Sequence, residues 1–429
     1  MNNTIKLAVA AALLAGASSA NAGIMIPAGD WTLDIGGIVN TYYTHTNTSG
    51  DRHSAGYGGL AFGGTNEALA GGTDNSQSNI TTGLLPNYLS VSGKTRQNDL
   101  DVGFTISINP GSSTRKAGAQ SFGDGGAAFQ ENRQAFLTFG DKSWGSIKLG
   151  KDLGIFASDA ILNDMTLLGV GSGAGGLAGN TTTLGRIGTG FIYADWKSQI
   201  AYSSPNWNGF SFTAGVTQAW NAVAVNGPAA IPGVVGPVTI ASATNSLRGG
   251  SSPAFEGKAS YEWAGDFGGK VWVSGITQKV EGFAAGISDD RADAYDIGAT
   301  VNVAGFGLTG YYYNGDGIGQ TVQMNHGFDR LGNSRDSDGY YVQATYTLPG
   351  VGTKLGVSYG QSTLDGNSAD VVLDELEDSM WTVGAYHPIT KHLNLVAEYS
   401  DVRSDFQRKG LSDLEGKSKT IALGAILFF

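Results

Sequence analysis

Apolar and polar residues alternate along almost the whole chain. The pattern is clearest in the segment 88–108, where Leu89 and Val91 share one face and Ser90 and Ser92 share the other. Successive side chains of a strand point to opposite sides, so this alternation predicts a strand with one apolar and one polar face.

The same segment contains a hairpin. After the short turn "QND", Leu100, Val102 and Phe104 share one face, while Asp101 and Thr105 lie on the other. Two amphipathic strands joined by a tight turn predict an antiparallel pair. Six further hairpins of this kind follow along the chain, and a first strand at 31–43 and a last strand at 417–429 bring the expected number of strands to sixteen.

The connections between these strands alternate in length. The turns within the hairpins are short and rich in Gly, Asn, Asp and Pro, whereas the other connections are long. The long ones lie at about 47–84, 110–130, 152–195, 218–253, 281–292, 314–338, 362–378 and 402–417. Short turns at one end and long loops at the other are typical of transmembrane barrels. The pattern therefore predicts an all-β fold, a sixteen-stranded antiparallel transmembrane β-barrel, in one domain at 23–429.

The C-terminal stretch "IALGAILFF" supports this interpretation. Ile421, Leu423, Leu427 and Phe429 share one face, and no polar tail follows. A strand that closes a barrel is paired along its length, its outward face meets lipid, and an aromatic residue suits the membrane interface. The final strand of a soluble sandwich would show the same period of two. The leader described next and the loop asymmetry favour the barrel.

Residues 1–22 have the features of a secretory signal peptide. Lys6 is their only charge, an apolar stretch runs from Leu7 to about Ala17, and Ala20-Asn21-Ala22 has the form of a cleavage site. We expect the mature chain to begin near Gly23.

Composition narrows the function. Without Lys6 the chain has 26 − 1 = 25 basic and 37 acidic residues, a net charge of −12, which argues against a nucleic-acid partner. The chain has no cysteine, so it has neither disulfides nor thiolate metal sites. Beyond the leader, no apolar run approaches the ~18 residues of a spanning helix, so the chain can enter a membrane only as a closed barrel.

Residues 133–152, "RQAFLTFGDKSWGSIKLGKD", carry a family resemblance. They are similar to the fourth and fifth strands of the Gram-negative outer-membrane porins, and the similarity extends over essentially the whole mature chain. The resemblance implies sixteen strands, a homotrimer and a third loop folded into the lumen. It also implies that Phe429 is a signal to the barrel-assembly machinery, and that the surroundings are outer-membrane lipids and lipopolysaccharide. The chain departs from the family at Lys151, where Arg is common, and its third loop lacks the acidic-aromatic signature of the enterobacterial members.

A barrel of about sixteen strands is too wide for its side chains to fill, so it encloses water. Selectivity then depends on the width and the charges of the narrowest point. We expect a basic wall opposite an acidic third loop, which would create a transverse field. The candidates are Lys94, Arg96, Arg133, Lys148 and Lys151 on the wall, and Asp152, Asp159 and Asp164 on the loop. Lys151 would turn inward only if a bulge follows Gly150. For each charge the alternative is a solvated or ion-paired residue at the rim.

Other motifs in the sequence give little support for a catalytic or metal-binding function. A G-x-S-x-G pattern at 356–360 lies within an alternating strand, although a nucleophile elbow requires a strand-to-helix turn. The G-x-G-x-x-G pattern at 171–176 lacks the flanking strand and helix of a nucleotide site. The histidines show no zinc spacing. Acidic groups at 289–293 and 374–378 have ligands that suit Ca²⁺, but a solvated rim is the simpler interpretation. We predict no reaction, no cofactor and no metal.

The sequence thus predicts a porin of the Gram-negative outer membrane that passes small hydrophilic solutes and ions by passive diffusion. One alternative is a substrate-specific channel for a sugar or a small anion. A less favoured alternative is a barrel enzyme of the outer membrane. The sequence leaves the preference between cations and anions open.

Overall fold

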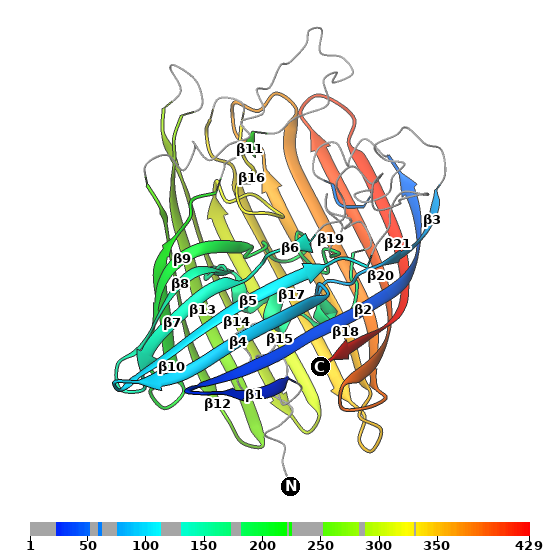
Figure 1. The fold of residues 1–429 in the computed structure, drawn as a ribbon. Coiled ribbons are helices and arrows are strands. Elements are labelled where there is room, and N and C mark those ends of the chain that lie inside the picture. The colour runs from blue at the N-terminus through cyan, green and yellow to red at the C-terminus, as the bar shows by residue number, and fades with distance from the viewer. Residues whose placement is uncertain are drawn as a thin grey trace.

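Sixteen strands close into an antiparallel barrel, as the sequence predicted (Figure 1). The computed structural model describes residues 23–51, 59–61, 75–112, 130–172, 182–220, 223–224, 252–282, 288–329 and 332–429; the expected signal peptide lies outside them. The barrel strands are β2 (Trp31–Gly50), β4 (Tyr88–Gln97), β5 (Leu100–Pro110), β7 (Ala135–Asp141), β8 (Gly145–Leu153), β9 (Trp196–Ser203), β10 (Phe210–Thr217), β12 (Ala254–Trp263), β13 (Phe267–Val280), β14 (Asp290–Val303), β15 (Phe306–Asp316), β17 (Asp336–Thr347), β18 (Lys354–Asp365), β19 (Leu373–Pro388), β20 (Leu393–Arg408) and β21 (Leu414–Phe428).

Shorter elements accompany the barrel. They are β1 (Ile24–Ala28), β3 (Ser76–Thr81), β6 (Gln130–Glu131), β11 (Val223–Ala224), β16 (Asn325–Phe328), the helix α3 (Ser158–Asn163) and the 3-10 helix η2 (Met165–Leu168). Within the described ranges, no helix has the length and apolar character needed to cross a membrane.

The barrel closes at β2, which pairs with β4 on one side and with β21 on the other. Phe429 extends this seam, because its backbone N–H and carbonyl both bond to Gly37, at 3.0 and 2.8 Å. Beyond that point β1 continues the pairing with β2, from Ile24 opposite Ile35 to Ala28 opposite Trp31. The N-terminal and C-terminal segments together therefore complete the wall.

The two faces of each strand differ as the alternation predicted. On β13, Val271 and Val273 point outward and are 42% and 49% exposed, whereas Trp272 and Ser274 point inward and are buried. The outward face is the one on which hydrocarbon contacts a barrel of this kind. The inward face contacts the lumen and the loops that enter it.

The strand ends that lead into the long connections lie at one end of the barrel, and the short turns lie at the other (Figure 1). Three of the turns have left-handed backbone at both central residues: Asn98 and Asp99 have φ of 49° and 63°, Asn208 and Gly209 have φ of 53° and 101°, and Ala304 and Gly305 have φ of 48° and 86°. Such turns match the twist of the strands that they join. The predicted alternation of loop length is confirmed.

Candidate pore constriction

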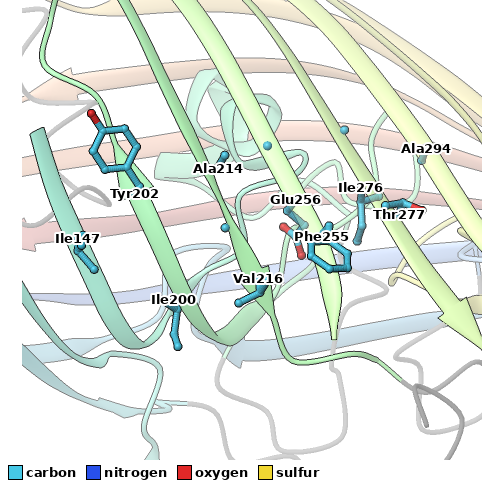
Figure 2. A pocket seen from close by; sticks show the side chains of 13 residues that line it. Ile147, Ile200, Tyr202, Ala214, Val216, Phe255, Glu256, Ile276, Thr277 and Ala294 are labelled. Atoms are coloured by element: carbon cyan, nitrogen blue, oxygen red, sulfur yellow. The ribbon is translucent and has the colours of Figure 1, made fainter. Parts of the chain in front are cut away.

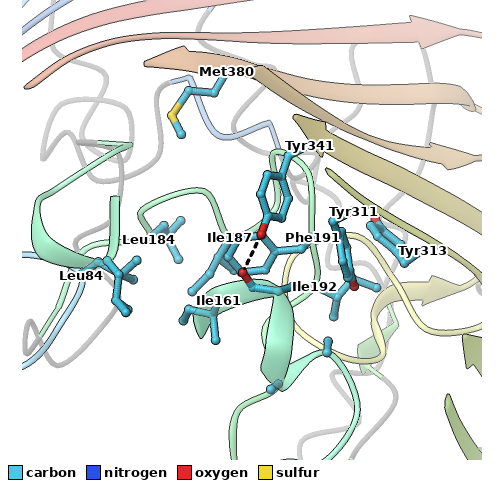
Figure 3. Close-up of a cluster of buried hydrophobic side chains, with 14 of the residues drawn as sticks. Leu84, Ile161, Leu184, Ile187, Phe191, Ile192, Tyr311, Tyr313, Tyr341 and Met380 are labelled. Carbon is cyan, nitrogen blue, oxygen red and sulfur yellow. Dashed lines mark hydrogen bonds between the residues drawn. The ribbon is translucent and has the colours of Figure 1, made fainter. Parts of the chain in front are cut away.

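The connection between β8 and β9, residues 154–195 and here called loop 3, contacts the inner wall of the barrel. The Tyr341 hydroxyl on β17 donates to the Ala160 carbonyl at 2.9 Å (Figure 3). Two residues further along β17, the Gln343 side chain accepts from the Met165 N–H at 2.6 Å and donates to the Asn163 carbonyl at 3.0 Å. Both wall residues lie on the inward face, so α3 and η2 lie inside the barrel.

Apolar packing fixes the same loop against the wall. The Phe191 ring lies 5.9 Å from the Tyr341 ring and 6.4 Å from the Tyr311 ring, the latter edge to face. Ile161 and Ile187 join this cluster, and all five side chains are buried (Figure 3). Burial of this kind stabilises a fixed position, so loop 3 narrows the lumen as a packed part of the wall.

Two further loops reach into the barrel. In the first long loop, the Leu60 N–H donates to Asp378 and the Ala61 N–H donates to Ser404, each at 2.9 Å. In the loop that follows β15, Gln323 accepts from the Lys197 ammonium at 2.5 Å. The alternation of apolar and polar residues does not predict these insertions.

Lys94 and Lys148 lie on one row across the inner wall. Lys94 pairs with Gly103, Gly103 with Thr138, and Thr138 with Lys148, along four adjacent strands. Three strand spacings separate the two lysines by about 14 Å. Only Gly103 and Thr138, which have small side chains, lie between them along this row.

In two groups of ion pairs on the inner wall, around Lys148 and around Asp159, the cations are more exposed than the anion. The Lys148 side chain is 31% exposed, whereas its partner Asp152 is 3% exposed. Lys258 and Lys270 are 28% and 21% exposed, and the Asp159 carboxylate that they share is 3% exposed. A third pair reverses this order, because Glu262, which pairs with Lys270 at 3.2 Å, is 54% exposed. The excess of exposed positive charge is therefore clearest at Lys148.

Lys148 also stacks on an aromatic ring. Its ammonium lies 4.8 Å from the centre of the Phe136 ring on the neighbouring strand. A cation over a ring face at this distance is stabilised by the ring quadrupole. Phe136 and Asp152 together fix the direction of this lysine.

Arg96 lies away from this row, beside the short turn between β4 and β5. Its guanidinium pairs with Asp101 and with Asp141, each at 2.9 Å. Arg133 is buried just before β7, with its guanidinium 5.8 Å from the centre of the Trp196 ring. Neither arginine joins the row of Lys94 and Lys148.

The prediction that a bulge after Gly150 turns Lys151 inward is wrong. The β7–β8 and β8–β9 pairings run through Gly150 without an extra residue, although Gly150 itself has φ of 129°. Lys151 therefore keeps the parity of Leu149, opposite to that of Lys148. Asp152 is not a loop residue either, because β8 extends to Leu153.

The two acids within loop 3 do not face the Lys94–Lys148 row. Asp159 pairs with Lys258 at 3.1 Å and with Lys270 at 2.5 Å, on β12 and β13. Burial by itself raises the pKa of this carboxyl, but the two lysines outweigh burial and hold the pKa of Asp159 below its usual value. The prediction that Asp159 faces Lys94 and Lys148 is therefore wrong, because Asp159 contacts other lysines instead.

Asp164 lies inside loop 3 itself. It caps η2 by accepting from the Thr166 N–H at 3.0 Å. Burial raises the pKa of Asp164, and the nearby Arg186 guanidinium opposes that shift. This carboxylate therefore serves the local structure of the loop.

Sequence reasoning missed four inward charges near loop 3, namely Lys258, Lys270, Glu256 and Glu398. Each lies on the polar parity of its strand, and that parity was the available signal. The partners of these charges belong to a distant loop, which the alternation does not reveal.

A cavity of about 720 Å³ lies on the outer surface of the barrel (Figure 2). Its floor follows one row of small outward residues, Ala214, Gly257 and Gly275. Tyr202 and Phe255 are among the larger residues that line it. Most of the residues that line it belong to the outward parity, although Glu256, Ile276 and Ala294 of the inward parity also border it.

The other candidate motifs do not form a functional site in the described part of the chain. Ser358 of the G-x-S-x-G pattern is buried within β18, on a strand and not on a strand-to-helix turn. Most of the glycine pattern at 171–176 lies outside the described residues. No group of three or more described His, Asp or Glu residues is arranged to hold a metal.

A family model for the Gram-negative porins matches residues 8–407. The chain belongs to the Gram-negative porins. It is a multi-pass protein of the outer membrane that forms a channel for passive diffusion, and family and fold point to a channel rather than to an enzyme. No curated protein sequence matches this porin significantly.

Solved porin structures share the fold at low sequence identity. An anion-selective porin from Comamonas acidovorans is 16% identical with a TM-score of 0.57, and the alignment covers 93% of this chain and 100% of that one. The outer membrane channel DcaP of Acinetobacter baumannii is 14% identical with a TM-score of 0.60, covering 95% and 100%. OmpF of Salmonella typhi, in complex with daunomycin, is 17% identical with a TM-score of 0.54, covering 95% and 100%.

Proposed function

We propose that this porin admits small hydrophilic solutes through a lumen narrowed by loop 3, and that it passes anions in preference to cations. Lys94 and Lys148 line the passage on the wall of β4 to β8, whereas Lys258 and Lys270 on β12 and β13 are balanced by Asp159 and Glu262. Charge at the narrowest part of a pore sets the ion preference. Distant loop acids contribute little, because salt screens them beyond a Debye length of about 8 Å at physiological ionic strength.

The observation that carries the proposal is the difference in exposure within the Lys148–Asp152 pair. Lys148 is 31% exposed and Asp152 is 3% exposed, so the pair is neutral in sum but positive toward the lumen. The net charge of −12 in the mature chain would by itself suggest a preference for cations. The local arrangement has the opposite sign and lies closer to the solute.

Planar-bilayer recording in a salt gradient tests the proposal. The reversal potential is expected to give an anion-to-cation permeability ratio above one. A ratio below one would refute the anion preference but leave the channel intact, whereas a folded sample that does not conduct would contradict diffusion itself.

A homotrimer is part of the proposal. A structure of OmpT from Vibrio cholerae, described as a trimer form, is 12% identical to this chain with a TM-score of 0.51. Channel openings in steps of three equal conductances are expected from a trimer. Single openings from particles of monomer mass would contradict it.

A specific sugar channel would use a ladder of aromatic residues exposed to the lumen. The inward tyrosines Tyr311, Tyr313 and Tyr341 are only 0–4% exposed, because loop 3 and neighbouring side chains cover them. They are therefore structural support for the loop, and general diffusion is the better supported function.

A further inference from the structure

Two buried glutamates lie on strands of opposite walls of the barrel. Glu256 is on β12 and Glu398 is on β20, and both point inward with 4% exposure. In the barrel, six strands separate β12 from β20 in one direction and eight in the other. A buried carboxylate needs hydrogen-bond partners to offset its loss of hydration.

Both glutamates find these partners in loop 3, and in the same way. One carboxylate oxygen of Glu256 accepts from the N–H groups of Ile155 and Phe156, both at 2.8 Å. One carboxylate oxygen of Glu398 accepts from the N–H groups of Val170 and Gly171, at 2.7 and 2.9 Å. Successive N–H groups that converge on one oxygen form an anion-binding concavity of the backbone.

The remaining oxygens of the two carboxylates are bound to the wall. The second oxygen of Glu256 accepts from the Lys197 ammonium at 2.5 Å and from the Thr217 hydroxyl at 2.7 Å. The second oxygen of Glu398 accepts from the Tyr386 hydroxyl at 2.6 Å. Each glutamate therefore joins the loop to the barrel through its two oxygens.

The backbone of loop 3 approaches Glu398 so closely that a side chain would not fit. A Cβ atom placed on Gly169 would lie 2.1 Å from a carboxylate oxygen of Glu398. The glycine thus allows the contact, and the wall carboxylate and the loop are matched to each other at this point.

We infer that Glu256 and Glu398 are the positioning residues that set the width of the pore, by holding the two ends of the loop 3 segment 155–171 on opposite walls. Between these ends, Tyr341 and Gln343 contribute neutral hydrogen bonds, and Asp159 pairs with Lys258 and Lys270 on β12 and β13. Bonds to a charged acceptor are stronger than neutral ones, and Glu398 supplies such an acceptor on the wall opposite to Glu256, Lys258 and Lys270. The inference rests on the proposed channel function.

The test replaces the Glu398 contact by a covalent bond that can be opened. The chain has no cysteine, so the double variant Gly169→Cys/Glu398→Cys has a single possible disulfide. The two positions are close enough for one, since a Cβ atom on residue 169 would lie within 2.4 Å of all three carboxyl atoms of Glu398. Single-channel current is then recorded from the same bilayer under a copper oxidant in air and after addition of dithiothreitol.

We expect the oxidised channel to show the quiet current of the unmodified protein, and the reduced channel to show a several-fold larger current variance with a broader range of conductance. The variants Glu398→Ala and Glu256→Ala should behave like the reduced form, and Glu398→Gln, which keeps an acceptor but loses the charge, should lie between. Glu377→Ala on the outward face of β19 is the matched control and should remain quiet. Equal variance in the oxidised and reduced channels would overturn the positioning role, whereas loss of all conductance in the unmodified protein would instead contradict the channel.

Discussion

Lys148→Glu offers the sharpest test of how this porin distinguishes ions. Lys148 and Lys94 are about 14 Å apart, so an ion midway between them is about 7 Å from each. At that distance a unit charge in water contributes about 0.6 kcal/mol. Reversing the charge doubles the change to about 1.2 kcal/mol, and screening at 0.1 M salt halves it to about 0.6 kcal/mol.

The change has opposite signs for an anion and a cation, so the two differ by about 1.2 kcal/mol in total. The anion-to-cation permeability ratio should therefore fall by roughly 8-fold in Lys148→Glu. The new carboxylate would also face Asp152, which loses its cation, so this figure is a lower estimate of the change.

The assay is the reversal potential in a salt gradient, with Lys142→Glu as the control. Lys142 is exposed in the turn that precedes β8. Its neighbour Asp141 pairs with Gly145, three residues or about 10 Å from Lys148 along β8, so Lys142 lies at least about one Debye length from Lys148 at 0.1 M salt. The same charge change at that position should leave the ratio almost unaltered. If both variants give the same reversal potential, Lys148 does not act on the permeating ion and the reasoning fails.

Three further predictions concern other parts of the molecule. Val273→Arg, at the middle of the lipid-facing side of β13, should lower the free energy of unfolding in lipid by about 2–4 kcal/mol. Val303→Arg, at the end of β14, should lower it by only about 0–1 kcal/mol. Equal losses of stability for the two variants in urea titrations would contradict the placement of hydrocarbon on this face. Lys258→Met together with Lys270→Met leaves Asp159 buried without its cations, and should cost about 3–5 kcal/mol of stability; a double variant as stable as the unmodified porin would show that the carboxylate has other partners. Phe429→Ala should reduce the amount of folded barrel in outer-membrane fractions, measured by its heat-dependent migration in gels, while refolding in detergent stays normal; a normal amount in the membrane would argue against an assembly signal at Phe429.

The wall of the barrel was predictable because parity is a local property. The immediate neighbours in the sequence show which side of the sheet a residue occupies, as for Leu89, Val102 and Val273. The hairpin turns are recognisable from residues that tolerate left-handed backbone, such as Asn98 and Asp99. The number of strands follows from counting such segments. For the same reason Lys94 and Lys148 could be placed on the inner face from the sequence.

The contents of the barrel were not predictable in this way. Asp159 was expected to face Lys94 and Lys148, but it lies against Lys258 and Lys270, and nothing in the sequence near residue 159 specifies which of the inner strands the loop will contact. Glu256 and Glu398 illustrate the same limit. Their parity indicates an inward direction, whereas their partners are backbone N–H groups about a hundred or more residues away. Non-local contacts of this kind depend on how the loop fits the space that the wall leaves.

The seam at β2 has a consequence for the order of events in biogenesis. β2 lies near the start of the chain, and its partner from Ile38 to Gly50 is β21, at the very end. Until residue 429 has left the inner membrane, β2 has an open edge, and no shorter product of translation can seal the cylinder. Export of the chain must therefore be completed before insertion of the barrel can be completed. Between these two events the exported chain must be kept from aggregating.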